Sequence, residues 1–162
     1  MLPELTLQFD DNGFLIPYSP VPTNLDTMRR VFVDEFPNSV SRRPIFERYE
    51  ELNARLMQLI PGGFTQWVDG SFVSRKVNPN DIDVLVFVDN VVHKQHERTF
   101  KALRSEFGTG VGRVDVRTIL VYPERHRYRN YYESDRVQWL FDWSRTSTTP
   151  RLNKGFIQII IS

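Results

Sequence analysis

Two aspartates separated by one apolar residue, Asp81 and Asp83, stand at the start of an apolar run over residues 84–88. In a β-strand, residues i and i+2 share a face, so both carboxylates would point the same way while Ile82 and Val84 point into the core. Two carboxylates this close repel unless a cation lies between them, and oxygen ligands suit Mg²⁺ or Mn²⁺. A solvated strand end, with Asp81 capping the preceding turn, explains the same pattern.

The dipeptide Gly70-Ser71 ends an earlier apolar run, before a spacer of residues 72–80. Glycine lets the backbone approach a phosphate closely, and N–H groups at a strand-to-helix turn point toward an anion. The serine adds a hydroxyl donor. An ordinary strand-ending turn is the alternative. Beside a carboxylate pair on an adjacent strand, however, the turn indicates a site for a nucleotide and a metal ion.

A two-metal arrangement needs a third carboxylate, since one ion activates the attacking oxygen and the other holds the triphosphate. Asp115 is the candidate, because it lies between Val114 and Val116 in a predicted strand. Arg113 and Arg117 share its face of that strand. They suit two interpretations, neutralisation of a bound triphosphate or a salt-bridged polar strip on an exposed sheet face.

A β-sheet must hold these residues, and the periodicity predicts strands over residues 65–69, 81–88, 113–122 and 156–161. Between the strands we expect a short helix or turn at residues 72–76 and helices at residues 93–107 and 134–143. Near the N-terminus, alternation predicts strands at residues 5–9 and 14–16, and three prolines keep the next residues extended. Residues 1–22 would thus form an N-terminal arm or hairpin on the surface.

Two helices should support the sheet. One is expected over residues 25–36, capped by Thr23 or Asn24 and ended by Pro37. The other begins near Ser41 and ends at Pro61. Its apolar residues recur at intervals of four and three in one continuous stripe, Ile45, Tyr49, Leu52, Leu56 and Leu59. The predicted fold is α+β, a short mixed sheet with the three aspartates on one edge face, backed by these helices.

Composition bounds the possible functions. With 162 residues, 40% apolar and 25% charged, the chain suits a single domain, residues 1–162. Without cysteine it has no disulfide framework, thiolate zinc site or cysteine nucleophile. A net charge of +1 gives no overall attraction to polyanions. Residues 1–4 lack signal-peptide features and no apolar run is long enough for a membrane span, so we expect a cytoplasmic protein with no membrane partner.

Gly70-Ser71, the nine-residue spacer, Asp81-Ile82-Asp83 and the later Val114-Asp115-Val116 resemble the signature of the polymerase-β-like nucleotidyltransferase superfamily. The chain also resembles a little-characterised group of small stand-alone bacterial members of it. That second likeness rests on residues 67–72, Lys76, residues 79–83 and residues 154–157.

The resemblance implies a nucleotidyltransferase fold in which Asp81, Asp83 and Asp115 bind two Mg²⁺ ions and Gly70 and Ser71 hold a nucleoside triphosphate. A hydroxyl of RNA, protein or another nucleotide would attack the α-phosphate and release pyrophosphate, with Asp115 as the base or as the ligand that orients the hydroxyl. The spacer lacks the Arg-Gly-containing helix of familiar minimal members. Ser74, Arg75 or Lys76 would then supply the missing phosphate contacts, and Lys76 is preferred.

Small stand-alone members often belong to toxin–antitoxin or phage-defence modules, so a partner protein from the same operon is an expectation by analogy. The rival interpretation is a non-catalytic antitoxin or partner subunit that keeps the fold and nucleotide binding. A metal-dependent phosphohydrolase is a third, without a supporting set of extra ligands.

For several other distinctive residues, structural roles explain the sequence. Asp69 is expected to hydrogen-bond the amides of the turn, and Trp67 to lie in the core. Residues 125–132, basic and aromatic, either stack a base and follow a phosphate backbone or form a solvated loop. Trp139, Phe141 and Trp143 are expected to pack the last helix against the core.

Overall fold

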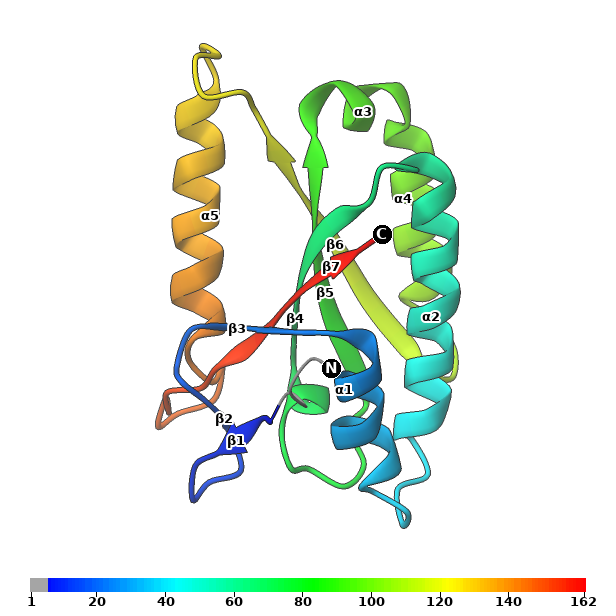
Figure 1. The fold of residues 1–162 in the computed structure, drawn as a ribbon, viewed down its shortest axis with the longest axis vertical. Coiled ribbons are helices and arrows are strands. Elements are labelled where there is room, and N and C mark those ends of the chain that lie inside the picture. Colours follow the sequence, from blue (N-terminus) through cyan, green and yellow to red (C-terminus); the bar gives the residue numbers. More distant parts are fainter. Residues whose placement is uncertain (1–5) are drawn as a thin grey trace, which may run out of the picture.

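The computed structural model of the protein describes residues 6–162. Figure 1 shows the order of its elements. The strands are β1 (Gln8–Phe9), β2 (Leu15–Ile16), β3 (Pro20–Thr23), β4 (Phe64–Asp69), β5 (Asp81–Asp89), β6 (Arg113–Val121) and β7 (Phe156–Ile161). The helices are α1 (Leu25–Arg29), which continues as a π-helical turn (Arg30–Asp34), α2 (Arg42–Leu59), α3 (Asn90–Gln95), α4 (Glu97–Phe107) and α5 (Arg129–Trp143); a 3₁₀ turn spans Ser71–Val73.

Five strands form one mixed sheet in the order β3-β7-β4-β5-β6. The pairs β3–β7 and β5–β6 are parallel, and β4 runs antiparallel to both β7 and β5. A separate antiparallel pair, β1–β2, lies beside the sheet. The architecture is thus a mixed sheet with helices on its faces, which agrees with the predicted α+β class.

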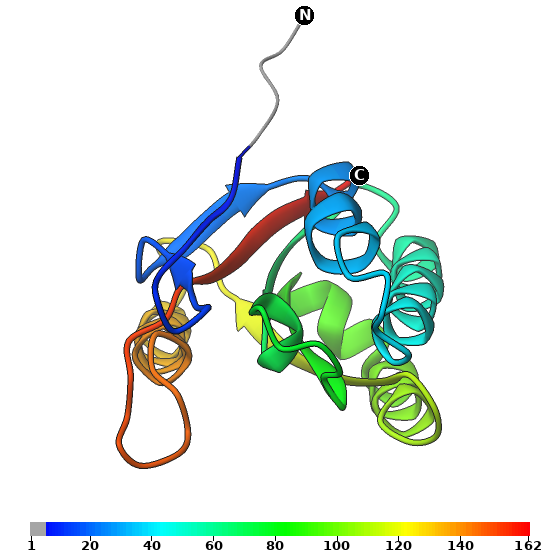
Figure 2. The ribbon, with the colours of Figure 1, turned by 90° about the horizontal axis from the view of Figure 1, so that it is seen from below.

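One face of the sheet holds the main core. Figure 2 shows α1, α2 and α4 along this side of the sheet. From the strands, Val68, Val84 and Val116 point into it and are buried. The apolar stripe predicted for α2 faces them, and its members from Ile45 to Leu56 are at most 1% exposed. Because the stripe covers a sheet apolar on this side, the prediction of a supporting helix is confirmed.

The opposite face carries α5, and its apolar cluster is smaller. Trp67, Leu85, Ile119 and Phe156 are buried there, covered by residues of α5 that are only partly buried. Between Arg129 and Trp143, all of which the structure describes, no residue is buried. The prediction of a packing role is correct for Trp139 and Trp143 but wrong for Phe141, which is 49% exposed because it points away from the cluster.

Several predicted boundaries differ from the structure. The first helix ends at Asp34 rather than residue 36, and its predicted cap is confirmed, since the Asn24 side chain accepts from the Thr27 N–H. The helix predicted at residues 93–107 is two helices that meet at His96, because Asp89 caps a separate first turn through the Val91 and Val92 N–H groups. The Leu5 end of the first predicted strand lies outside the described residues.

Two segments taken for irregular structure belong to the fold. The N-terminal arm does not simply lie on the surface, because Pro20–Thr23 pairs with β7 as an edge strand of the main sheet. Proline suits an edge, where its missing N–H faces away from the ladder. Helix α5 begins at Arg129, five residues before the predicted start, and Arg129 donates to Tyr122 O at 2.6 Å and pairs with Glu133.

In the described part of the chain no helix combines the length and apolarity of a membrane span.

Candidate active site

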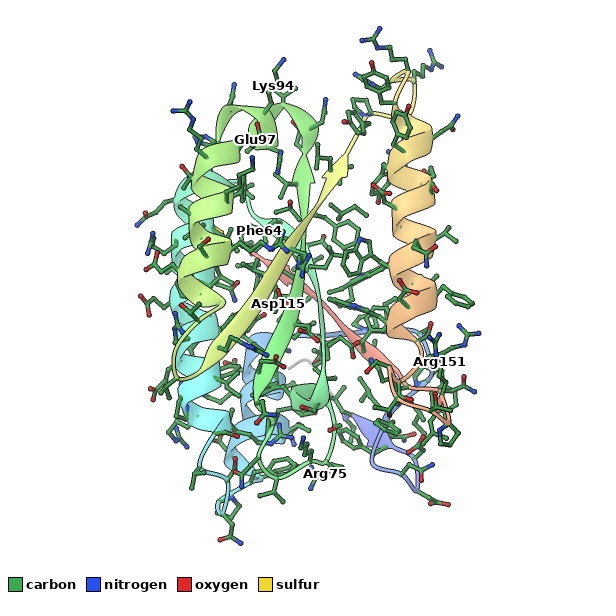
Figure 3. The ribbon with its side chains drawn as sticks, turned by 180° about the vertical axis from the view of Figure 1, so that it is seen from behind. Phe64, Arg75, Lys94, Glu97, Asp115 and Arg151 are labelled. Carbon is green, nitrogen blue, oxygen red and sulfur yellow. The ribbon has the colours of Figure 1, made fainter. Side chains whose placement is uncertain are left out.

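Four carboxylates lie on the same face of the sheet as α5. They are next to the part of that face that the aromatic cluster around Trp67 covers. Asp83 on β5 lies directly opposite Asp69 on β4 and Asp115 on β6, and Asp81 precedes it by two residues. Directly opposite residues of paired strands point to the same face. The strand of Asp115 therefore lies beside the strand of Asp81 and Asp83, and Asp69 joins them from β4. Figure 3 shows Asp115 on the edge strand β6.

Asp83 is the most perturbed of these groups. Burial raises the pKa of its carboxyl to about 7, and repulsion from the carboxylates of Asp81, Asp69 and Asp115 pushes it in the same direction. The positive charge of Lys154 only partly opposes this shift. A carboxylate with this surplus of negative neighbours gains most from a bound cation.

Two arginines of β6 now occupy parts of this cluster. Arg113 donates to Asp81, and Arg117 Nε lies 3.3 Å from Asp115 Oδ1. Within residues 6–162, no group of three or more histidine, aspartate and glutamate side chains is placed so that it could hold a metal ion as it stands. The donor chemistry nonetheless suits Mg²⁺ or Mn²⁺, because the ligands are all carboxylate oxygens and Asp83 is poorly neutralised. Arg113 and Arg117 would compete with a bound cation for the carboxylates of Asp81 and Asp115.

The turn at Gly70-Ser71 follows directly on β4 and touches this cluster. Gly70 has a φ of +89°, a conformation that L side chains rarely adopt. A Cβ at this position would lie 2.9 Å from Asp83 Oδ2. Glycine is therefore required twice here, by the backbone conformation and by the approach of the carboxylate. Ser71 begins the 3₁₀ turn, so the predicted short helix or turn after Gly-Ser is confirmed in this tighter form.

Asp69 and Lys154 form a buried ion pair beside the turn, with side chains 5% and 12% exposed. Lys154 Nζ also donates to Trp143 O at 2.9 Å, which ties the end of α5 to the site. Burial raises the pKa of Asp69 to about 6, although Lys154 and the Gly70 N–H act to lower it. Among the described residues, Asp69 Oδ1 is buried without a hydrogen-bond partner. Lys154, rather than the expected turn amide, is thus the hydrogen-bond donor to Asp69.

The spacer is held from beneath by Arg42, the first residue of α2. Its side chain is 1% exposed and donates to four backbone carbonyls, those of Phe32, Phe72, Ser74 and Lys76. Its guanidinium also lies 3.9 Å from the centre of the Phe36 ring. Desolvation, followed by repulsion from Arg75, lowers the pKa of Arg42 to about 10. This clamp fixes the path of residues 72–76 and leaves the side chains of Arg75 and Lys76 exposed.

A cavity of about 840 Å³ opens between the Gly70-Ser71 turn and the segment that follows α5. Its floor includes the predicted Gly70, Ser71, Lys76 and Asp83. The opposite wall comes from the end of α5 and the loop after it, Asp142, Trp143, Arg145, Thr146, Ser147 and Thr148. Asp69 and Lys154 also line it, whereas Asp81 and Asp115 lie outside its lining, although they share the sheet face of Asp83.

The structure therefore brings the six predicted site residues to one region and adds others that the sequence interpretation missed. Asp69 was assigned to the turn, and Lys154 carried no role beyond its place in a motif. Their partnership spans 85 positions, so no local pattern indicates it. Arg42 likewise reads as one more polar residue at a helix start. For residues 145–148, which form part of the cavity wall, the sequence indicated only a polar loop.

Comparison with known proteins returns neither a matching curated protein nor a matching solved structure. A family profile matches residues 7–160, nearly the whole chain. The protein accordingly belongs to DUF6932, a family of unknown function.

Proposed function

We propose that the protein has a nucleotidyltransferase fold and transfers a nucleoside monophosphate from a nucleoside triphosphate to a hydroxyl acceptor, with Mg²⁺ or Mn²⁺ as cofactor. The observation that carries this proposal is the register of β4, β5 and β6. It sets Asp83 directly between Asp69 and Asp115 and beside the Gly70-Ser71 turn. A phosphate-sized anion and its cations would find backbone N–H groups and carboxylates on one open face.

In the proposed reaction, the acceptor oxygen attacks the α-phosphorus, the bond from that phosphorus to the bridging oxygen breaks, and pyrophosphate leaves. The hydroxyl proton passes to a carboxylate, for which Asp115 is the candidate. When bound, the divalent ions would lower the charge of the triphosphate and activate the attacking oxygen. Asp81, Asp83 and Asp115 would hold them.

The remaining residues position the nucleotide. Gly70 leaves room for the chain to approach a phosphate, and Ser71 offers a hydroxyl donor. Lys76 and Arg75 line the same cavity and add positive charge on the spacer side. Lys154, held by Asp69 and Trp143 O, places a further ammonium group in the cavity wall. With Arg145 on the opposite wall, four cationic side chains line the cavity, which suits a triphosphate better than a neutral ligand.

A label-transfer assay tests this proposal. The purified protein is incubated with Mg²⁺, each α-labelled nucleoside triphosphate and pools of cellular RNA and protein. We expect transfer that falls by about 1,000-fold or more in Asp81→Asn/Asp83→Asn, the loss typical of removing charge-stabilising groups. Asp135→Asn, at an exposed position of α5 outside the cavity lining, is the matched control and should keep full activity.

A non-catalytic partner subunit is the second candidate. The engagement of Asp81 by Arg113 and of Asp115 by Arg117 favours it, since these arginines neutralise carboxylates without a metal ion. This candidate predicts nucleotide binding in calorimetry but no transfer to any acceptor. Transfer by the wild type that the double variant lacks would exclude it, whereas transfer unaffected by the double variant would exclude the proposed site.

A further inference from the structure

A run of aromatic rings stands at the junction of β6 and α5, far along the sheet from the aspartates. Ring centres are 4.9 Å apart for Tyr122 and His126, and 5.5 Å apart for both His126–Tyr128 and Tyr128–Tyr131. We call residues 122–131 the tip. Tyr128 is 37% and Tyr131 64% exposed. The Tyr131 ring, the more exposed of the two, is therefore the one most open to a further stacking partner.

Arginines accompany the rings. The Arg127 guanidinium lies 4.5 Å from the centre of the Tyr128 ring, and Arg125 and Arg127 are both exposed. Arg129, in contrast, serves the fold through Tyr122 O and Glu133. Exposed rings interleaved with arginines present charge and stacking faces together, the combination that single-stranded nucleic acids use.

A hollow of about 400 Å³ lies beside the tip. Tyr122, His126 and Tyr128 form one side of it, and His93 and Lys94 of α3 form part of the other. Figure 3 shows Lys94 at the same end of the molecule as the tip. The volume lies in the range of about 300–1,000 Å³ for small-ligand sites, so it admits a single base splayed from a strand.

A second hollow, of about 280 Å³, continues along the same edge strand. Arg117 and Thr118 of β6, Lys101 and Arg104 of α4, and Trp139 of α5 line it. The two hollows share His93 and Glu97. We call the two hollows and the tip together the β6 furrow.

The net charge of the furrow is positive, although the tip contains Glu124. Of the described residues that line the two hollows, Glu97 alone is acidic, and Lys101 lies 3.7 Å from it. Lys94 and Arg104 lie along the path, with Arg125 and Arg127 at its end, and Arg117, which pairs with Asp115, lies where the path meets the carboxylates. Because Arg117 is two residues from Asp115, the furrow leads from the tip to the carboxylate cluster.

We propose that the β6 furrow binds a single-stranded nucleic acid, with bases stacked on the tip and the phosphates following the basic residues toward Asp115. That its terminal hydroxyl is the acceptor rests on the proposed function. Seven residues of strand separate Asp115 from Tyr122, about 23 Å at the rise of a β-strand. At about 3.4 Å per stacked nucleotide, the furrow spans about seven nucleotides.

Binding is measured by fluorescence anisotropy without nucleoside triphosphate, so the result does not depend on catalysis. The probes are end-labelled single-stranded RNA and DNA of about 12 nucleotides, within the usual site size, and the matching RNA duplex. Tighter binding of either single strand than of the duplex supports the proposal. Whichever of single-stranded RNA and DNA binds more tightly identifies the class of nucleic acid that the furrow binds. Preference for the duplex, or displacement of RNA by an acidic peptide at equal charge concentration, overturns it.

The variant Arg125→Ala/Arg127→Ala/Tyr131→Ala removes exposed groups of the tip. Its dissociation constant should rise at least about tenfold, and the slope of log K against log salt should fall by about 1.4, or about 0.7 per lost phosphate contact. The control Arg43→Ala/Arg151→Ala/Tyr18→Ala removes the same charges and an exposed tyrosine away from the furrow. Arg151 lies at the other end of α5 from the tip (Figure 3). Equal losses in both variants would refute the proposal.

Two further comparisons separate this inference from the proposed function. Asp83→Asn should bind RNA as tightly as the wild type while losing transfer. Transfer should also weaken for acceptors shorter than about seven nucleotides, which fail to reach from the tip to Asp115. If circular dichroism shows that the triple variant does not fold, the single variant Arg127→Glu replaces it. We expect Arg127→Glu to bind RNA at least about fivefold more weakly than the wild type. Unchanged RNA binding by a folded Arg127→Glu would contradict the proposal.

Discussion

The two faces of the sheet are built differently although they share the same strands. On one face, three helices bury an unbroken apolar surface from Val68 across Val84 to Val116. On the other, α5 covers only the aromatic cluster around Trp67, and the same strands continue into a row of aspartates. Alternation along each strand separates the two faces residue by residue.

The difference places stability on one face and candidate chemistry on the other. Burial of apolar side chains stabilises the fold in proportion to the area removed from water, so the face with three helices contributes most of the hydrophobic stabilisation. The aspartate face works against stability, since Asp83 lies partly buried among like charges. Substitutions on the two faces should therefore differ in size and even in sign.

The largest expected effect on stability compares Leu52→Ala with Trp139→Ala. Leu52, on the main core face, is 0% exposed, and its truncation should lower the free energy of unfolding by about 2–5 kcal/mol. Trp139 is a larger side chain but only partly buried, so its truncation should cost at most about 2 kcal/mol. Urea unfolding measures both. An equal or greater loss for Trp139→Ala would show that α5 contributes as much as the helices of the main core.

The next effect concerns Lys154→Met, which leaves Asp69 buried without its cation. We expect a loss of about 3 kcal/mol at pH 8. The folded-state pKa of Asp69 is about 6, above its ordinary value of 3.8, so the folded state loses stability as pH rises between these values. Without Lys154 the folded-state pKa rises further, and the loss extends to higher pH.

Thermal unfolding in a chelating buffer at pH 5 and pH 8 measures this dependence. The destabilisation by Lys154→Met should be much smaller at pH 5, where Asp69 is protonated in the variant. The double variant Asp69→Asn/Lys154→Met should recover stability at pH 8, because it carries no buried charge. A loss that is the same at both pH values would contradict the role of the ion pair.

The smallest effect has the opposite sign. In the absence of metal ions at pH 8, Asp83→Asn should raise the free energy of unfolding by about 1–2 kcal/mol. The gain is this modest because solvent partly screens the repulsion between Asp83 and its neighbours. The raised pKa of Asp83 means that the folded wild type loses stability as pH rises from about 4 to 7, and asparagine does not titrate. At pH 4 the two proteins should be equally stable.

How far the sequence predicts the structure varies with the range of the interactions. The α2 stripe and the strands around Asp83 and Asp115 follow local periodicity, and they are found as predicted. The early start of α5 depends on Tyr122, which precedes the helix by seven residues. The membership of Pro20–Thr23 in the sheet depends on β7, at the far end of the chain. Such boundaries depend on partners that no short window contains.

Local sequence patterns already establish that Asp81 and Asp83 share a face, that Gly70 begins a turn and that Asp115 lies in a strand. Each of these follows from a local rule of backbone geometry. No such pattern shows that Asp69 and Asp115 flank Asp83 directly or that Lys154 pairs with Asp69, and both become visible in the folded chain. Strand register and a contact across 85 positions arise from packing of the whole sheet, which the local pattern does not encode.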